Sequence, residues 1–273
     1  MPELPEMETY RQLLTPRLVG QTIRAVRIHR EKSVNLPAGQ FAQGILGVRI
    51  AAIDRRAKYL LFRLETGQAL LLHLMLGGLM FLGSEEDRPD RNTQVELDLS
   101  GGQTLYFIGL RLGYLHLLDE RQYLAVLAKL GPEPLAPDFT LERFEQLLSG
   151  TRGTLKTTLV NQQKLSGIGN CYADEICFEA AILPTRPLAS LSLQPAGDSG
   201  RLYSAMRAVL MEAIRQGGYM EQPLFAGDHL TGGYNDHCLV YDRGGEPCVR
   251  CGGAIIQAEL SSRKVFYCAQ CQH

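Results

Sequence analysis

Apolar and polar residues follow two different periods along this chain. Between residues 4 and 19, apolar side chains recur three or four positions apart, which predicts an amphipathic helix. These side chains are Met7, Tyr10, Leu14 and Leu18. Pro16 is expected to end or kink this helix, and Gly20 suits its C-terminal end. From about 21 to 130 the pattern becomes strand-like, with Gly, Asp and Ser turns, which indicates an antiparallel sandwich or barrel. The expected strands cover 22–28, 48–53, 59–64, 69–74, 94–99 and 104–107.

The pattern changes after residue 130. Residues 131–138 hold three prolines and predict an interdomain linker. Helical periodicity then predicts helices at 140–148, 153–162, 170–181 and 200–216. Residues 217–237 lack a period and are interpreted as a long loop, which in a compact domain is usually functional or mobile. Strand signals return at 238–240 and continue towards the C-terminus.

Four of the seven cysteines form two Cys-x-x-Cys pairs with sixteen residues between them: Cys248, Cys251, Cys268 and Cys271. Two pairs at this separation are typical of a closed, structural four-thiolate zinc site. The segments 254–258 and 264–267 are expected to form a hairpin between the pairs, with Arg263 at its tip. An arginine on such a tip suits phosphate recognition, although a solvated side chain explains Arg263 taken alone.

The first residues after Met1 carry candidate chemistry. Removal of Met1 would make Pro2 a secondary amine with an ordinary pKa of about 7.7–8.0, so part of it is nucleophilic near neutral pH. An amine that attacks a sugar carbon forms a cationic imine, and the carboxyls of Glu3 and Glu6 are available as acids. While Met1 remains, the Pro2 nitrogen is an amide and cannot attack. A proline-capped helix start explains the same residues without chemistry.

Two further segments suit phosphate binding. Alternation along 54–60 places Arg56 and Lys58 on one face of a strand. The turn 164–170 has two glycines before a helix, and Asn170 at its expected N-cap can offer an amide to a phosphate. A solvated edge strand would show the first pattern, and scaffolding explains the second equally well.

Composition narrows the class of protein. The chain has 273 residues, with 28 Lys and Arg against 29 Asp and Glu, so the net charge is −1. A polyanionic partner would therefore need locally gathered positive charge. Apolar runs are shorter than the roughly 18 residues of a membrane span, and a secretory signal is not visible, so we expect a cytosolic protein.

Five ordered motifs together resemble the formamidopyrimidine-DNA glycosylase/endonuclease VIII family. They are Pro2-Glu3-Leu4-Pro5-Glu6, the segment 55–61, the segment 130–135, Gly167-Ile168-Gly169-Asn170-x-Tyr172-Ala173-x-Glu175, and the four-cysteine finger. The Leu-Pro start resembles the formamidopyrimidine branch. The resemblance implies an α+β multidomain fold: an N-terminal helix and antiparallel β-sandwich at 1–130, a linker at 131–139, a helix-two-turns-helix domain at 140–237, and a zinc-finger hairpin at 238–273.

The resemblance also implies a function. The expected activity is that of a bifunctional DNA glycosylase and abasic-site lyase, which excises oxidised bases (formamidopyrimidine, with 8-oxoguanine as a further candidate) through an imine at Pro2, followed by β,δ-elimination. The implied catalytic residues are Pro2, Glu3, Glu6, Lys58 and Arg263. The expected DNA contacts are Lys58, His73, Met75, Leu76, Arg111, Leu112, Lys156, Asn170 and Arg263. We expect one structural zinc ion, no organic cofactor, damaged double-stranded DNA as partner, and a monomer in the bacterial cytosol and nucleoid.

This sequence departs from the branch in three places. Leu76, with Met75 beside it, stands where the branch has a methionine three residues after the histidine matching His73. The segment 109–113 is one residue shorter than its counterpart and lacks an aromatic residue, and the loop 217–221 lacks the usual threonine or serine. The preferred lesion and the opposite base therefore stay open. An endonuclease VIII-like preference for oxidised pyrimidines and a catalytically silent lesion binder are the alternatives.

Overall fold

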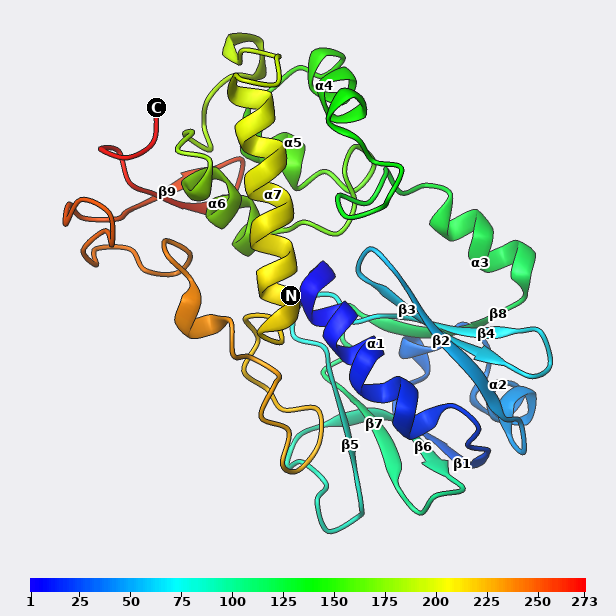
Figure 1. Cartoon of the computed structure of the whole chain (residues 1–273). Helices are drawn as coiled ribbons and strands as arrows, with labels where there is room; N and C mark the ends of the chain where they lie inside the picture. Colours follow the sequence, from blue (N-terminus) through cyan, green and yellow to red (C-terminus); the bar gives the residue numbers. More distant parts are fainter. The chain divides into compact units, whose positions relative to one another are not determined.

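The computed structural model describes all residues from Met1 to His273, and these form two compact units. The first, here called the sandwich unit, contains Met1–Lys129 and Gln216–Gly233. The second, here called the helical unit, contains Leu130–Arg215 and Tyr234–His273. Figure 1 shows both units in sequence colours. None of the helices is both long and apolar enough to cross a membrane.

Helix α1, Leu4–Leu18, opens the sandwich unit. It contains Pro16 and continues two residues beyond it, so the stop lies at Gly20, whose φ of 90° suits glycine. The helix buries Met7, Tyr10, Leu14 and Leu18 in the same apolar core that the sheets share. This confirms the expected helix and its buried face.

Two four-stranded antiparallel sheets make up the rest of the sandwich. Their strand orders are β1-β6-β7-β5 and β2-β3-β4-β8. The first sheet contains β1 Ile23–Ile28, β5 Leu79–Gly83, β6 Thr93–Leu99 and β7 Thr104–Ile108. The second contains β2 Ile50–Arg56, β3 Tyr59–Leu64, β4 Ala69–His73 and β8 Tyr114–Leu118. The expected sandwich is confirmed.

Four elements of this unit were absent from the sequence-based expectations. They are β5, β8, and the short helices α2 Ala38–Ile45 and α3 Glu120–Leu127. Strand β5 is largely buried on both faces, so it lacks the alternation by which a half-exposed strand is found. Helix α3 begins with a capping box between Asp119 and Gln122, a start signal that the sequence does contain.

The loop 217–233 packs in the sandwich unit, although its place in the sequence put it in the helical domain. The Leu82 N–H of β5 donates to the Leu224 carbonyl at 2.7 Å. The Arg17 guanidinium lies 3.9 Å from the centre of the Phe225 ring. Asp228 accepts the N–H groups of Leu224, Leu230 and Thr231 and so holds the loop in shape. These contacts explain why the loop packs against the β-sandwich.

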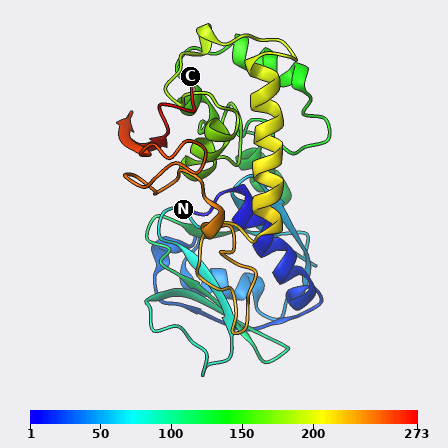
Figure 2. The same ribbon diagram turned by 60° about the vertical axis from the view of Figure 1, so that its left-hand side comes forward.

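The helical unit contains four helices and a terminal hairpin. The helices are α4 Leu141–Ser149, α5 Leu155–Leu159, α6 Asn170–Glu179 and α7 Asp198–Arg215. Figures 1 and 2 show α7 as the long yellow helix that runs beside α6. The hairpin pairs β9 Ile256–Leu260 with β10 Arg263–Tyr267 and lies against α6. Single 3-10 turns occur in the helical unit at Leu188–Ser190 and Asn235–His237, and in the sandwich unit at Glu31–Ser33.

One local expectation for the helical unit was wrong. Residues 238–240 do not form a strand, because the buried Glu175 carboxylate accepts the N–H groups of Leu239, Val240 and Tyr241 at 2.8–2.9 Å. The segment 131–139, expected as a linker, bonds the turn before α6: the Ser166 N–H donates to the Pro132 carbonyl at 2.9 Å. A side chain at Gly131 would meet the main chain of Lys164 at 2.6 Å, so this segment packs tightly on the turn before α6.

Candidate functional site

The start of α1 holds two buried carboxylates. Glu3 is the N-cap residue and is 2% exposed, and Glu6 is fully buried three residues later. The Glu3 N–H donates to Glu6 Oε2 at 2.7 Å, one half of a capping box that is present in both directions. Because Glu6 is bonded to the main chain of Glu3, it fixes the backbone that carries Pro2. The expected catalytic residues Pro2, Glu3 and Glu6 are thus brought together in one buried segment.

Glu6 also ties this segment to the loop after α7. The Tyr219 N–H donates to Glu6 Oε1 at 2.9 Å. Gly218 has a φ of 75°, and a side-chain Cβ there would lie 2.3 Å from Glu6 Oε1. The Tyr219 hydroxyl donates to the Met1 carbonyl at 3.2 Å, and the Met1 amine lies 3.4 Å from the same hydroxyl. Tyr219 was not among the expected site residues; the glycine pair 217–218 was the available signal, since it marks a close approach of the backbone.

Lys58 occupies a tight turn and not the middle of a strand. Arg56 pairs with Tyr59 across β2 and β3, so Ala57 and Lys58 form a two-residue connection. Ala57 adopts a φ of 53° there. The alternation that placed Arg56 and Lys58 on one strand face therefore ends before Lys58, and this expectation was wrong. The turn holds Lys58 beside the end of β4, where His73 lies.

His73 is held in a neutral form. Burial and, secondly, the positive charge of Lys58 lower its pKa from 6.5 to about 4. Its Nδ1 accepts the Met75 N–H at 3.1 Å. A neutral imidazole that accepts at Nδ1 carries its proton on Nε2, so His73 keeps one N–H donor at that atom. The Tyr59 ring meets the His73 ring edge-on at 4.5 Å and limits its orientation.

The turns 74–78 and 109–113 lie side by side at one end of the sandwich. Gly109 would bring a side chain within 2.2 Å of the Gly77 carbonyl, which shows how closely the two main chains approach. Leu110 is buried, while Leu76 and Leu112 are 67% and 62% exposed. The expected contacts Met75, Leu76, Arg111 and Leu112 are therefore grouped. Leu76 and Leu112 thus present two exposed apolar side chains on adjacent turns.

The turn before α6 contains Gly167 and Gly169, and the Gln162 side chain holds it in shape. Gly167 has a φ of 99°, and the Gln162 side chain accepts the Gly167 N–H at 2.9 Å and donates to the Ile168 carbonyl at 2.7 Å. Gly169 is the N-cap and Asn170 the first helical residue, one position from the expected N-cap at Asn170. Asn170 still lies at the positive end of the α6 dipole, where anions bind.

Arg263 lies where expected, at the tip of the C-terminal hairpin. It is exposed and starts β10 directly after Ser261 and Ser262, which have φ values of 50° and 60°. Two consecutive residues with positive φ form the tight turn typical of β-hairpins. This turn projects Arg263 from a short, rigid ribbon.

The burial of Lys156 contradicts the expectation that this residue contacts DNA. It is 1% exposed, and its Nζ donates to Asp174 Oδ1 and Oδ2, each at 2.8 Å, and to the Lys264 carbonyl at 2.6 Å. All three ammonium donors are used inside the helical unit. Burial raises the pKa of Asp174, although the Lys156 ammonium opposes the shift.

The four finger cysteines fit one tetrahedral metal ion. Their Sγ atoms all lie within 4.8 Å of one another, with Cys248 and Cys271 3.9 Å apart and Cys251 and Cys268 3.5 Å apart. Zinc–sulfur bonds of about 2.3 Å in a tetrahedron require sulfur separations of roughly 3.8 Å. The Arg250 N–H lies 3.4 Å from Cys248 Sγ, a contact that favours the thiolate. Four sulfur ligands leave no open coordination position, so the ion is structural.

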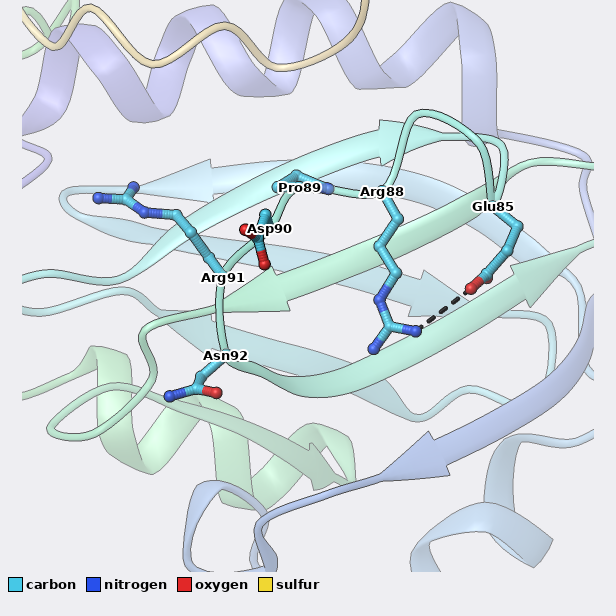
Figure 3. Close-up of a pocket in the computed structure, with 6 residues that line it drawn as sticks. All are labelled: Glu85, Arg88, Pro89, Asp90, Arg91 and Asn92. Atoms are coloured by element: carbon cyan, nitrogen blue, oxygen red, sulfur yellow. Dashed lines mark hydrogen bonds and ion pairs between the residues drawn. The ribbon is translucent and has the colours of Figure 1, made fainter.

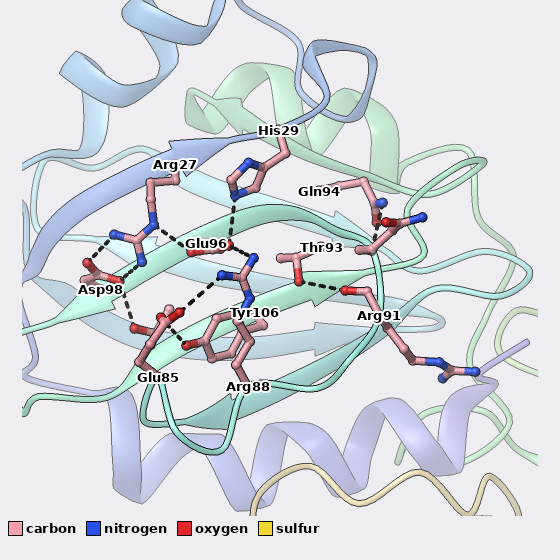
Figure 4. Close-up of polar contacts among 12 residues, drawn as sticks. Arg27, His29, Glu85, Arg88, Arg91, Thr93, Gln94, Glu96, Asp98 and Tyr106 are labelled. Carbon is pink, nitrogen blue, oxygen red and sulfur yellow. Dashed lines mark hydrogen bonds and ion pairs between the residues drawn. The ribbon is translucent and has the colours of Figure 1, made fainter.

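A separate polar hollow of about 600 Å³ lies on the outer face of the first sheet. Figure 3 shows the loop Glu85–Asn92 that lines it. Beneath the loop, the Glu96 carboxylate bonds Arg27, His29 and Arg88 at 2.6–3.0 Å (Figure 4). The hollow contains none of the expected site residues. The ion pairs instead hold the loop on the sheet.

Three family models match successive parts of the chain. They are the formamidopyrimidine-DNA glycosylase N-terminal domain at 1–114, the formamidopyrimidine-DNA glycosylase H2TH domain at 130–222, and the zinc finger found in FPG and IleRS at 245–273. The last match agrees with the sulfur geometry, and the four cysteines form a structural zinc site.

Proteins similar to this chain over its whole length belong to the same family as the three domain models. The formamidopyrimidine-DNA glycosylase of Chloroflexus aurantiacus is 38% identical, covering 100% of this chain and 98% of the relative. That of Symbiobacterium thermophilum is 39% identical and covers 100% and 89%. The Lactococcus lactis Fpg bound to abasic-site DNA superposes with a TM-score of 0.91 at 28% identity, covering 99% of both chains. The Fpg of Thermus thermophilus gives 0.87 at 36% identity, covering 99% and 98%. This chain belongs to the formamidopyrimidine-DNA glycosylase family.

Proposed function

We propose that this protein is a DNA glycosylase with abasic-site lyase activity, which removes oxidised purines from duplex DNA. The observation that carries the proposal is the buried Glu6 carboxylate, which holds Pro2 and Glu3 against the Gly218–Tyr219 loop. Relatives across the whole chain carry the glycosylase name, and a Lactococcus lactis relative has been solved with Fapy-dG DNA. On this proposal the protein acts as a monomer in the bacterial cytosol and nucleoid.

Pro2 is the proposed nucleophile, after Met1 has been removed. Its nitrogen lone pair attacks the sugar C1′, and the C1′–N bond to the damaged base breaks as the base takes up a proton. Glu3 supplies or relays the protons that open the sugar ring and give the iminium ion. The iminium acidifies the adjacent C2′–H, whose loss expels the 3′ phosphate, and a second elimination expels the 5′ phosphate.

The remaining expected residues are proposed to hold the DNA. Lys58, Asn170 and Arg263 are assigned to phosphates, and His73 donates from Nε2. Leu76 and Leu112 are assigned to the gap left by the extruded base. Extrusion costs a few kcal/mol, so a phosphate grip and an apolar wedge are both needed to make it favourable. Zinc stiffens the hairpin that carries Arg263.

Borohydride trapping on a duplex with one abasic site tests the covalent step. Protein whose mass shows that Met1 is absent should form a cross-link, and Pro2→Gly should not. Glu3→Gln should stop base removal while it still cleaves a preformed abasic site. Failure of the mature protein to cross-link would favour the silent-binder alternative. A panel of oxidised purines and pyrimidines, each opposite all four bases, separates the two glycosylase alternatives.

A further inference from the structure

The ion pair between Lys156 and Asp174 occupies an unusual place: the open edge of a two-stranded hairpin. Strand β10 pairs with β9 at every position from Arg263 to Tyr267. The two-residue turn makes Arg263 and Leu260 a hydrogen-bonded pair, so Arg263, Val265 and Tyr267 bond β9. In an antiparallel ribbon the alternate residues direct their N–H and C=O groups away from the partner strand. For β10 these residues are Lys264 and Phe266.

The ion pair bonds two of these four outward-facing groups, one on each residue. The Lys264 carbonyl accepts from Lys156 Nζ at 2.6 Å, and the Phe266 N–H donates to Asp174 Oδ2 at 3.1 Å. The pair therefore substitutes for a third strand along β10. Lys156 lies on α5 and Asp174 on α6, so two helices hold the backbone next to Arg263. The side chains of Lys156 and Asp174 are 2% and 0% exposed, which excludes contact with a ligand.

We infer that Lys156 and Asp174 are positioning residues for Arg263, which they hold in register to bind a DNA phosphate. The inference rests on the proposed function, in which Arg263 contacts that phosphate. Zinc fixes the base of the hairpin through Cys268, but it does not bond the strand at 264–266. The ion pair supplies that second attachment, one residue from the arginine.

A double-mutant cycle tests the inference. Affinity is measured for a duplex that contains a non-cleavable tetrahydrofuran abasic analogue, across a series of salt concentrations, with zinc content and thermal unfolding recorded for each protein. Arg263→Ala should weaken binding roughly tenfold or more, since it removes a charge-assisted contact. Lys156→Met should weaken it roughly three- to tenfold, and the double variant should bind no more weakly than Arg263→Ala.

The salt dependence distinguishes positioning from a loss of stability. Lys156→Met should lower the slope of log affinity against log salt by about as much as Arg263→Ala does, although the Lys156 side chain is buried. Arg201→Met is the matched control: Arg201 bonds Asp198 on α7 at 2.6 Å, but no β10 residue. Its affinity should stay within about twofold of the parent.

Each outcome is informative. If Arg263→Ala binds as the parent does, the proposed phosphate contact is wrong. If Arg263→Ala is weak but Lys156→Met is not, or if the two effects add, the positioning role is wrong and the proposed function stands. Lys156→Met with Asp174→Asn removes both charges while the asparagine oxygen still accepts the Phe266 N–H. Loss of zinc in that variant would also overturn the inference, because the pair would then support the metal site itself.

Discussion

Replacing Gly218 with alanine tests whether the position of the buried Glu6 carboxylate affects both the stability of the protein and the rate of base removal. Gly218 has a φ of 75°, a conformation that costs alanine about 1–2 kcal/mol. Its new Cβ would lie 2.3 Å from Glu6 Oε1, so the carboxylate or the loop must shift by roughly 0.7 Å to reach a tolerable contact. This shift strains the bonds from Tyr219 and Glu3 to Glu6, and bonds to a charged group are each worth about 1.5–3 kcal/mol.

Gly227 provides a matched control in the same loop. Its φ is 82°, and a Cβ there meets nothing within 4 Å. Gly227→Ala should therefore cost only the backbone term of about 1–2 kcal/mol, while Gly218→Ala should cost about 3–4 kcal/mol. Thermal unfolding should place Gly218→Ala about 4–8 °C below Gly227→Ala.

The same pair of variants separates stability from activity. Single-turnover base removal should be roughly 10- to 100-fold slower in Gly218→Ala, because small displacements of catalytic groups reduce rates by such factors. It should be unchanged in Gly227→Ala. Equal stability and equal rates in the two variants would refute the packing argument. A stability loss with an unchanged rate would refute the connection between Glu6 and catalysis.

Three further perturbations have defined outcomes. Cys251→Ala should lose its zinc ion and bind DNA at least tenfold more weakly. Cys177 is buried and is not a zinc ligand, so Cys177→Ala should keep one zinc per chain in a colorimetric assay. Full DNA affinity in the metal-free variant would contradict the role of the finger in binding. Because the pKa of His73 is lowered to about 4, the unfolded chain takes up a proton near and below pH 6.5 that the folded chain does not, so stability should fall by about 1.5 kcal/mol from pH 6.5 to 5. Urea unfolding should show this loss in the parent and not in His73→Gln; parallel pH profiles would refute it. Leu112→Ala should reduce the unstacking signal of 2-aminopurine placed beside the lesion by roughly threefold or more, and Leu124→Ala, which is 52% exposed on α3, should not; equal signals would exclude the wedge.

The predictable parts of this protein are those set by local chemistry. The helix 4–18, most sandwich strands, and the zinc ligands follow from period and spacing within short segments. Strand β5 was missed because it is buried on both faces and so has no alternation.

The parts that could not be predicted depend on long-range partners. Lys156 is a residue type that commonly contacts phosphates, but its ammonium group forms a buried ion pair with Asp174 on another helix. Residues 238–240 have strand-like composition, but Glu175, more than sixty positions earlier, bonds their N–H groups. A sequence pattern contains no record of which buried carboxylate will satisfy a distant backbone. Such pairings become visible only in three dimensions.

The two adjacent carboxylates on α6 have a consequence for protein engineering. Asp174 accepts a backbone N–H of strand β10, and Glu175 accepts backbone N–H groups of the segment that leads into the hairpin. The C-terminal 36 residues are therefore not an autonomous cassette, even though zinc closes their loops. A graft that transfers those residues to another scaffold must also bring α6 and its lysine partner, or supply equivalent acceptors at the new junction.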